Sequence, residues 1–181
     1  MERNLVMIAI FAALIAALGL MPKLTLGFGV PITAQSLGIM LCGTVLGARR
    51  GALAVLLFLF LVALGLPLLA GGRGGLGVFV SPSVGYLIGF PIAAAATGYI
   101  MEIWRPSSVF LAAFVAALAG GVLVLFVPGV IGMSITLGRS LPEAAMLGLP
   151  FVPGDVVKAV LAGFITAGID RSRPDSLLSR Q

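Results

Sequence analysis

Residues 108–127 read SVFLAAFVAALAGGVLVLFV, twenty consecutive residues without a charged side chain. At 1.5 Å of rise per residue, a helix of this length covers about 30 Å, the thickness of the hydrocarbon layer of a bilayer. Comparable apolar runs recur along the chain, at 4–21, 33–48, 51–69, 83–101 and 153–170. The sequence therefore predicts an all-α membrane protein, a compact bundle of six transmembrane helices.

The apolar segment 128–150 is interrupted by several prolines and glycines, and it contains Arg139 and Glu143. Proline and glycine interrupt helices. We expect a structured outer loop there, with a short helix, because a seventh span would place the two ends of the chain on opposite sides of the membrane.

The composition also favours a membrane protein. Of the 181 residues, 60% are hydrophobic and 9% are charged, whereas a soluble domain carries about 25% charged residues. The bundle leaves no room for a soluble catalytic domain. We expect a single six-helix substrate-binding domain over residues 1–181.

The net charge is +5, but the basic residues lie mostly between apolar segments, where they set orientation and do not indicate nucleic-acid binding. With six spans and both termini in the cytoplasm, the outer side receives Lys23, Arg73 and Arg139. The inner side receives the larger group, which is Arg3, Arg49, Arg50, Arg105, Arg171, Arg173 and Arg180. This bias predicts a multi-pass protein with both termini in the cytoplasm.

Several kinds of chemistry are missing from the sequence. It has no histidine and one cysteine, Cys42, so it can form neither an internal disulfide, a Ser-His-Asp triad nor a Cys/His metal site. It also lacks the G-x-x-x-x-G-K-[ST] motif that binds nucleotide phosphates. We expect no enzyme activity, no cofactor and no metal.

Asp155 and Lys158 are the clearest ionisable pair within an apolar segment. They follow Pro153 and Gly154, and a spacing of three residues places both on one face of a helix. Ionisable groups inside a membrane are costly and usually functional. Either the pair binds a ligand in a cavity, or the two side chains satisfy each other near the outer interface and anchor the helix.

Arg73 lies in the glycine-rich segment AGGRGGLG at 70–77. The match of 72–77 to G-x-G-x-x-G carries little weight because it follows a membrane span and not a strand. Glycine lets a backbone approach a ligand closely, and a guanidinium binds a carboxylate through two parallel hydrogen bonds. We expect Arg73 to bind a carboxylate; an incidental arginine in a surface loop is the alternative.

Gln35 lies in VPITAQS at 30–36, where the second span begins from the outer side. Because an amide facing lipid is costly, Gln35 either contacts a ligand or joins two helices. Tyr86 or Phe79 is available to pack against a ring of the ligand. These polar patches come from different spans, and we expect them to form one outward-facing pocket.

Ala9, Ala13 and Ala17 recur every four residues in the first span, and Ala12 and Ala16 repeat beside them. Small residues at this spacing let another helix approach closely. The approaching helix belongs either to this chain or to a partner protein.

Five short motifs follow one another over residues 30–160. They are VPITAQ at 30–35, LGARRGA at 46–52, GLP at 65–67 with GGRGG at 71–75, GYLIGFP at 85–91 and PFVPGDVVKA at 150–159. Together they resemble BioY, the biotin-binding S component of energy-coupling factor (ECF) transporters. Each motif alone is weak, but the ordered series is specific.

The resemblance implies high-affinity biotin uptake through an outward-open site, by a multi-pass protein of the bacterial plasma (inner) membrane. It implies that Asp155 and Lys158 meet the ureido ring of biotin, and that Arg73 or Lys158 meets the carboxylate. It also implies a complex with a transmembrane coupling subunit and ATPase subunits, contacted partly through the small residues of the first span. A stand-alone secondary transporter, an S component for another small vitamin and an intramembrane scaffold are the alternatives, and a homo-oligomer is compatible with each.

Overall fold

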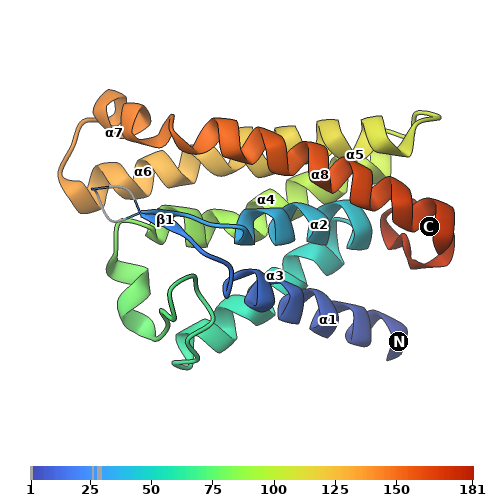
Figure 1. Ribbon diagram of the computed structural model, residues 1–181, viewed down its shortest axis with the longest axis horizontal. Coiled ribbons are helices and arrows are strands. Elements are labelled where there is room, and N and C mark those ends of the chain that lie inside the picture. Colours follow the sequence, from blue (N-terminus) through green and yellow to red (C-terminus); the bar gives the residue numbers. More distant parts are fainter. Residues whose placement is uncertain (1, 26, 28–29) are drawn as a thin grey trace.

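The computed structural model describes residues 2–25, 27 and 30–181. Within these residues the regular structure is helical apart from one short antiparallel hairpin, in which β1 (Leu24–Thr25) pairs with β2 (Pro31–Ile32), and an isolated bridge between Leu69 and Arg73. The helices lie side by side in a bundle (Figure 1), which confirms the expected all-α architecture.

The α-helices follow one another along the chain, and the two longest connections join α1 to α2 and α3 to α4. Their bounds are α1 (Glu2–Leu18), α2 (Gln35–Leu46), α3 (Ala48–Ala63), α4 (Val84–Ile103), α5 (Val109–Ala117), α6 (Leu125–Leu137), α7 (Leu141–Gly148) and α8 (Phe151–Ser172). A π-helical segment, η2 (Leu118–Val124), joins α5 to α6 without a break. Short 3-10 helices complete the fold: η1 (Leu76–Val80), η3 (Pro174–Ser176) and η4 (Leu178–Arg180).

Three of the described helices are long and apolar enough to cross a membrane, judged by length and composition: Val84–Ile103, Val109–Leu137 and Phe151–Ser172. The helices α1, α2 and α3 are shorter, at 17, 12 and 16 residues. They pack against the longer ones and against one another.

Helix α2 lies at the centre of the bundle and contacts α1, α3, α4 and α8. All of its residues except Leu37 are buried. Its polar Thr44 is satisfied by a hydrogen bond of 2.8 Å from the hydroxyl of Thr166 on α8. The polar residues of α2 are therefore enclosed, because neighbouring helices cover them.

The prediction of a loop at 128–150 is wrong for the first part of that segment. Residues up to Leu137 continue the fifth span, so that Val109–Leu137 is one helix of 29 residues. The π-helical turns of η2 already depart from the i→i−4 hydrogen-bond pattern just before Pro128, so the missing N–H of the proline is tolerated. Val130 and Met133 are buried, and their packing stabilises the helix although the local sequence disfavours it.

The second part of that segment agrees better with expectation, since α7 is a short helix. Gly138 ends α6 with a left-handed backbone, at a φ of 61°. Ser140 and Glu143 then form a capping box that starts α7. The hydrogen bonds that Glu143 accepts from Ser140 lower the pKa of its carboxyl group.

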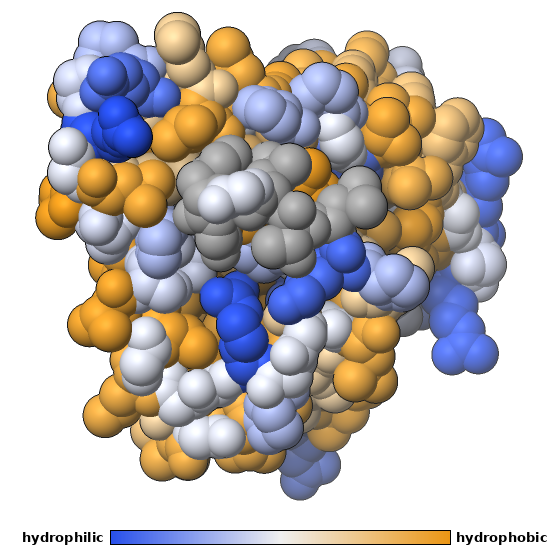
Figure 2. All heavy atoms as spheres, turned by 60° about the vertical axis from the view of Figure 1, so that its left-hand side comes forward, coloured by the Kyte–Doolittle hydropathy of each residue, from blue (hydrophilic) through white to orange (hydrophobic). Residues whose placement is uncertain are grey.

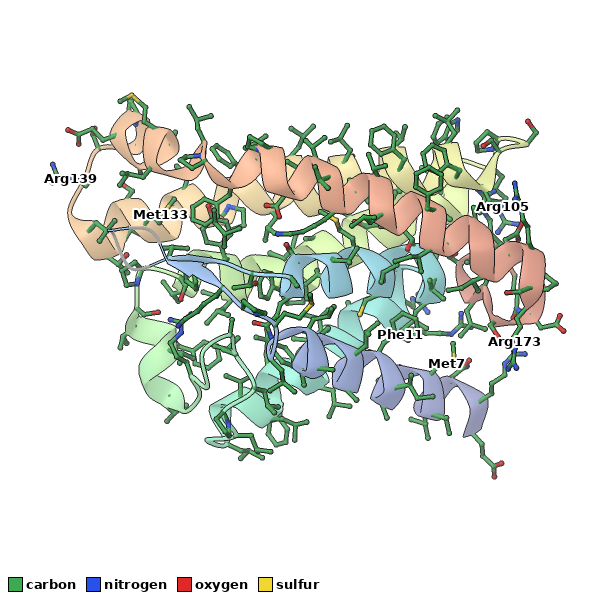
Figure 3. All side chains as sticks on the ribbon, in the orientation of Figure 1. Met7, Phe11, Arg105, Met133, Arg139 and Arg173 are labelled. Carbon is green, nitrogen blue, oxygen red and sulfur yellow. The ribbon has the colours of Figure 1, made fainter. Side chains whose placement is uncertain are left out.

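The two chain ends lie at the same end of the bundle (Figure 1). Figure 3 shows Arg105 and Arg173 at this end, and Arg139 at the opposite one. The segment Leu177–Gln181 folds back here, where Leu177 and Leu178 are buried. Three arginines from different elements donate hydrogen bonds to it: Arg3 to Gln181 Oε1 at 2.7 Å, Arg50 to the Leu178 carbonyl at 3.4 Å and Arg105 to the Arg180 carbonyl at 3.2 Å.

Candidate functional site

A pocket opens among α2, α4, α8 and the hairpin, away from the chain ends. It holds about 540 Å³ of atom-free space, including the part open to solvent. Side chains with polar groups line it from separate parts of the chain: Thr33, Gln35, Ser36, Arg73, Ser83, Tyr86, Asp155 and Lys158. The patches that the sequence analysis expected to converge are thus brought together in space.

The remaining lining of the pocket is apolar. It comprises Val30, Pro31, Ile32, Leu69, Leu87, Phe90, Leu125 and Phe151. The rings of Tyr86 and Phe151 pack against each other with centroids 5.6 Å apart and planes tilted by 46°. Such walls suit a compact ring system, with a few polar groups to orient it.

Asp155 and Lys158 occupy the first half of α8 and face this pocket. The ammonium of Lys158 lies 2.8 Å from Asp155 Oδ1, and the two side chains are only 15% and 14% exposed. Ser36 on α2 joins the pair: its hydroxyl donates to Asp155 Oδ1 and accepts from Lys158, both at 2.9 Å. The pair is therefore turned into the bundle.

This network leaves binding capacity unused. Within the described part of the chain, both hydrogen bonds to the Asp155 carboxylate go to Oδ1, so Oδ2 can accept from a ligand. Lys158 uses two of its three N–H donors. A ligand group with an N–H donor beside a carbonyl acceptor can therefore bond to Asp155 Oδ2 and to the third N–H of Lys158.

Arg73 contributes a second cation to the pocket wall. Its backbone forms a pair of hydrogen bonds with Leu69, from Leu69 N to Arg73 O at 2.9 Å and from Arg73 N to Leu69 O at 3.2 Å. Its Nε is buried and has no hydrogen-bond partner among the described residues. Burial lowers the pKa of Arg73, and an anionic ligand would offset that cost.

Gln35 lies in the pocket wall but is only 2% exposed. Its Nε2 donates to the carbonyls of Ile15 at 3.1 Å and Leu68 at 3.0 Å, and its Oε1 accepts from the amide of Ala70 at 3.0 Å. Of the two roles that the sequence left open, the structure therefore favours the joining of separate segments.

Tyr86, and not Phe79, lies in the pocket lining. The Tyr86 hydroxyl is buried without a hydrogen-bond partner in residues 2–25, 27 and 30–181, so it too can bond a ligand. Sequence reasoning did not single out Ser36, Ser83, Phe90 and Phe151 as site residues. Ser36 directly follows Gln35 in the segment 30–36, and Phe151 lies four residues before Asp155 in the motif 150–159. This proximity to chosen residues is the signal that could have found them.

The alanines of the first span lie apart from this pocket. Ala9, Ala13 and Ala17 are exposed on α1, whereas Ala12 is buried. This exposed face is thus left largely uncovered by the described part of the chain, and it is open to lipid or to another protein.

Comparison with known proteins agrees with this geometry. A family model described as the BioY family matches residues 2–175. The chain belongs to the BioY family. This membership confirms the resemblance that the short motifs indicated.

Individual members of the BioY family match over nearly the whole chain. The chain is 52% identical to the biotin transporter BioY of Rhodobacter capsulatus, over 99% of this chain and 100% of that protein. It is 49% identical to the biotin transporter BioY of Rhizobium etli, over 90% of each.

A solved structure shares the fold. The crystal structure of the S component for biotin from an ECF-type ABC transporter matches with a TM-score of 0.89 and 32% sequence identity, covering 94% of this chain and 92% of that one. Together with the apolar helices, this likeness shows a membrane protein. In the view of Figure 2, hydrophobic side chains cover much of the surface, and strongly hydrophilic ones lie below the centre, at the upper left and at the right-hand edge.

Proposed function

We propose that this chain binds biotin in the pocket described above and is the substrate-binding S component of an ECF-type transporter. The observation that carries the proposal is the Asp155–Lys158 pair, which faces the pocket in a chain 52% identical to a biotin transporter. Its domain is the six-helix bundle of residues 1–181, in the plasma membrane, with the pocket on the outer side and the chain ends in the cytoplasm.

The pocket chemistry supports biotin as the ligand. The ureido ring of biotin has N–H donors for Asp155 Oδ2 and a carbonyl for the remaining donor of Lys158. The bicyclic ring fits between Tyr86, Phe90 and Phe151, and the carboxylate pairs with Arg73. Two cations against one carboxylate give the pocket a net positive charge, which favours an anionic ligand.

Transport requires partners in this proposal. The chain has no phosphate-binding motif of its own, and the likeness to an S component supports a complex with a transmembrane coupling subunit and ATPase subunits. The exposed alanines of α1 (Ala9, Ala13 and Ala17) are the face that we assign to the coupling subunit. The protein itself performs no chemistry on biotin.

Calorimetric titration of the detergent-purified protein tests the proposal. We expect saturable binding of biotin and no binding of thiamine or riboflavin under the same conditions. Binding of another vitamin in place of biotin would assign a different S component, and no binding of any would leave a scaffold role.

Uptake assays test the mechanism separately. We expect biotin uptake into cells that also contain the coupling and ATPase subunits, and loss of that uptake when ATP is depleted. Uptake that persists without those subunits and collapses with a protonophore would indicate a stand-alone secondary transporter.

A further inference from the structure

We propose that Gln35 is a positioning residue that fixes the Arg73 loop to the end of α1, and that it raises ligand affinity through Arg73 without touching the ligand. The inference rests on the proposed function for the identity of the ligand. It replaces the direct role in substrate binding that the sequence alone suggested for Gln35.

The amide of Gln35 has little left to offer a ligand. Both of its N–H donors are used, on the carbonyls of Ile15 and Leu68, and its oxygen accepts from Ala70. Two acceptors on one side and a donor on the other also fix which way the amide points. A side chain that is 2% exposed and bonded in this way is part of the scaffold.

The bonds to Leu68 and Ala70 lie on either side of Leu69, which is the residue paired with Arg73. Leu69 and Arg73 exchange two backbone hydrogen bonds, at 2.9 and 3.2 Å, and both residues line the pocket. Gln35 therefore holds the first strand of this small loop, and the loop in turn presents the guanidinium.

At its other end the link reaches α1. The Ile15 carbonyl accepts from Gln35 Nε2 at 3.1 Å and from the Gly19 amide at 3.2 Å. Gly19 leaves space for the junction: an added Cβ would lie 2.5 Å from the Leu68 carbonyl oxygen and 2.9 Å from Gln35 Nε2. The end of α1, the start of α2 and the Arg73 loop thus meet at one amide.

A double-mutant cycle between Gln35 and Arg73 tests whether the first acts through the second. In the otherwise unchanged protein, we expect Gln35→Met to weaken biotin binding by about tenfold, within the range of couplings seen in shared networks. In an Arg73→Ala background, we expect the same change to cost less than about twofold, since no guanidinium is left to position. An equal loss in both backgrounds, or no loss in either, would overturn the inference.

Two further variants guard against a general folding defect. Gly19→Ala should repeat the effect of Gln35→Met on affinity, because it displaces the same loop by another route. Thr44→Val removes a buried hydrogen bond elsewhere on α2, so it should lower the melting temperature and leave affinity unchanged. If Thr44→Val weakens binding as much as Gln35→Met does, the effect is global and the positioning role is refuted.

Amide hydrogen exchange separates this inference from the proposed function. Without any ligand, Gln35→Met should accelerate exchange at Ala70 and Leu69 by at least about tenfold relative to the unchanged protein. If the unchanged protein fails to bind biotin, the proposed function is wrong, whereas unaltered exchange at Ala70 and Leu69 would contradict the role of Gln35.

Discussion

Ser36 on α2 donates a hydrogen bond of 2.9 Å to the carboxylate of Asp155 on α8, 119 residues further along the chain. The same hydroxyl accepts from Lys158, so an ion pair that a single helix could form alone is tied to the centre of the bundle. The pair therefore keeps one orientation, with its remaining donor and acceptor toward the pocket. Preorganisation of this kind saves the entropy of ordering the side chains when a ligand binds.

Loss of either charge should weaken biotin binding. We expect Asp155→Asn and Lys158→Ala each to reduce affinity by about tenfold or more, because a hydrogen bond to a charged group contributes about 1.5–3 kcal/mol. Calorimetry on purified protein measures the change. Asp175→Asn, the same substitution at an exposed position, is the control, and unchanged affinity in both site variants would remove the pair from the site.

Ser36→Ala should have a smaller effect than either charge removal. The Asp155–Lys158 contact of 2.8 Å remains without the hydroxyl, but the pair loses its connection to α2. We expect affinity to fall by about threefold to tenfold, consistent with about 1 kcal/mol for one hydrogen bond. Ser134→Ala is the control: it removes an exposed hydroxyl near the C-terminal end of α6 and should bind biotin normally. If Ser36→Ala loses as much affinity as Asp155→Asn does, Ser36 contacts the ligand itself.

Arg73→Ala should remove the preference for a carboxylate. We expect the variant to bind biotin about tenfold or more weakly, because biotin carries the carboxylate that a guanidinium recognises. The neutral biotin amide lacks this charge, so the variant should bind it almost as well as the unchanged protein does. Competition titrations with the two ligands measure both affinities. Equal losses for biotin and its amide would show that Arg73 supports the pocket in another way.

A bulky residue on the exposed face of α1 should separate binding from transport. We expect Ala13→Leu to abolish most biotin uptake in cells that contain the coupling subunits, while the purified variant binds biotin as before. Val157→Leu enlarges an exposed residue on α8 and should affect neither property. Parallel losses of binding and uptake in Ala13→Leu would instead point to a packing role inside the bundle.

The segment Leu177–Gln181 should shield the C-terminal end of α2 from the cytoplasm. Ser179 donates to the Thr44 carbonyl at 2.5 Å, two residues from Cys42, the single cysteine of the chain. Ending the chain after Ser176 should raise the labelling rate of Cys42 by a membrane-impermeant maleimide in inverted vesicles by at least about tenfold. Gln181→Ala is the control, because it removes an exposed side chain and its hydrogen bonds to Arg3 and Asp175 but leaves Leu177 and Leu178 in place. Full protection in the shortened chain would contradict the prediction.

Much of the architecture could be predicted because the signal is long and uniform. Six apolar runs correspond to helical regions of the bundle, and the segment 83–101 differs from α4 by only a few residues at either end. The continuation of the fifth span through Pro128 could not be predicted, since proline and glycine argue locally for a loop. Contacts with α4, remote in sequence, decide that helix.

The candidate site could be predicted where its residues are of a type that is rare in apolar segments. Asp155 and Lys158 are conspicuous because charges are scarce in apolar segments, and both line the pocket. Ser36 and Phe151 are ordinary residues in such a sequence, and only the pairing of α2 with α8 brings Ser36 to the carboxylate. Gln35 was noticed for the right reason, its polarity, but its partners Ile15 and Leu68 depend on how the loop folds over the end of α1.

The length of the helix Val109–Leu137 has a consequence for how a solute enters. Its 29 residues extend about 43 Å, whereas the hydrocarbon layer is about 30 Å thick. In the proposed topology, a helix that begins at the inner face of this layer and runs close to its normal would place its last turns, and α7, above the lipid tails on the pocket side. A water-soluble, negatively charged molecule then finds the entrance in the headgroup layer and descends along a protein wall, without dissolving in the membrane at any stage.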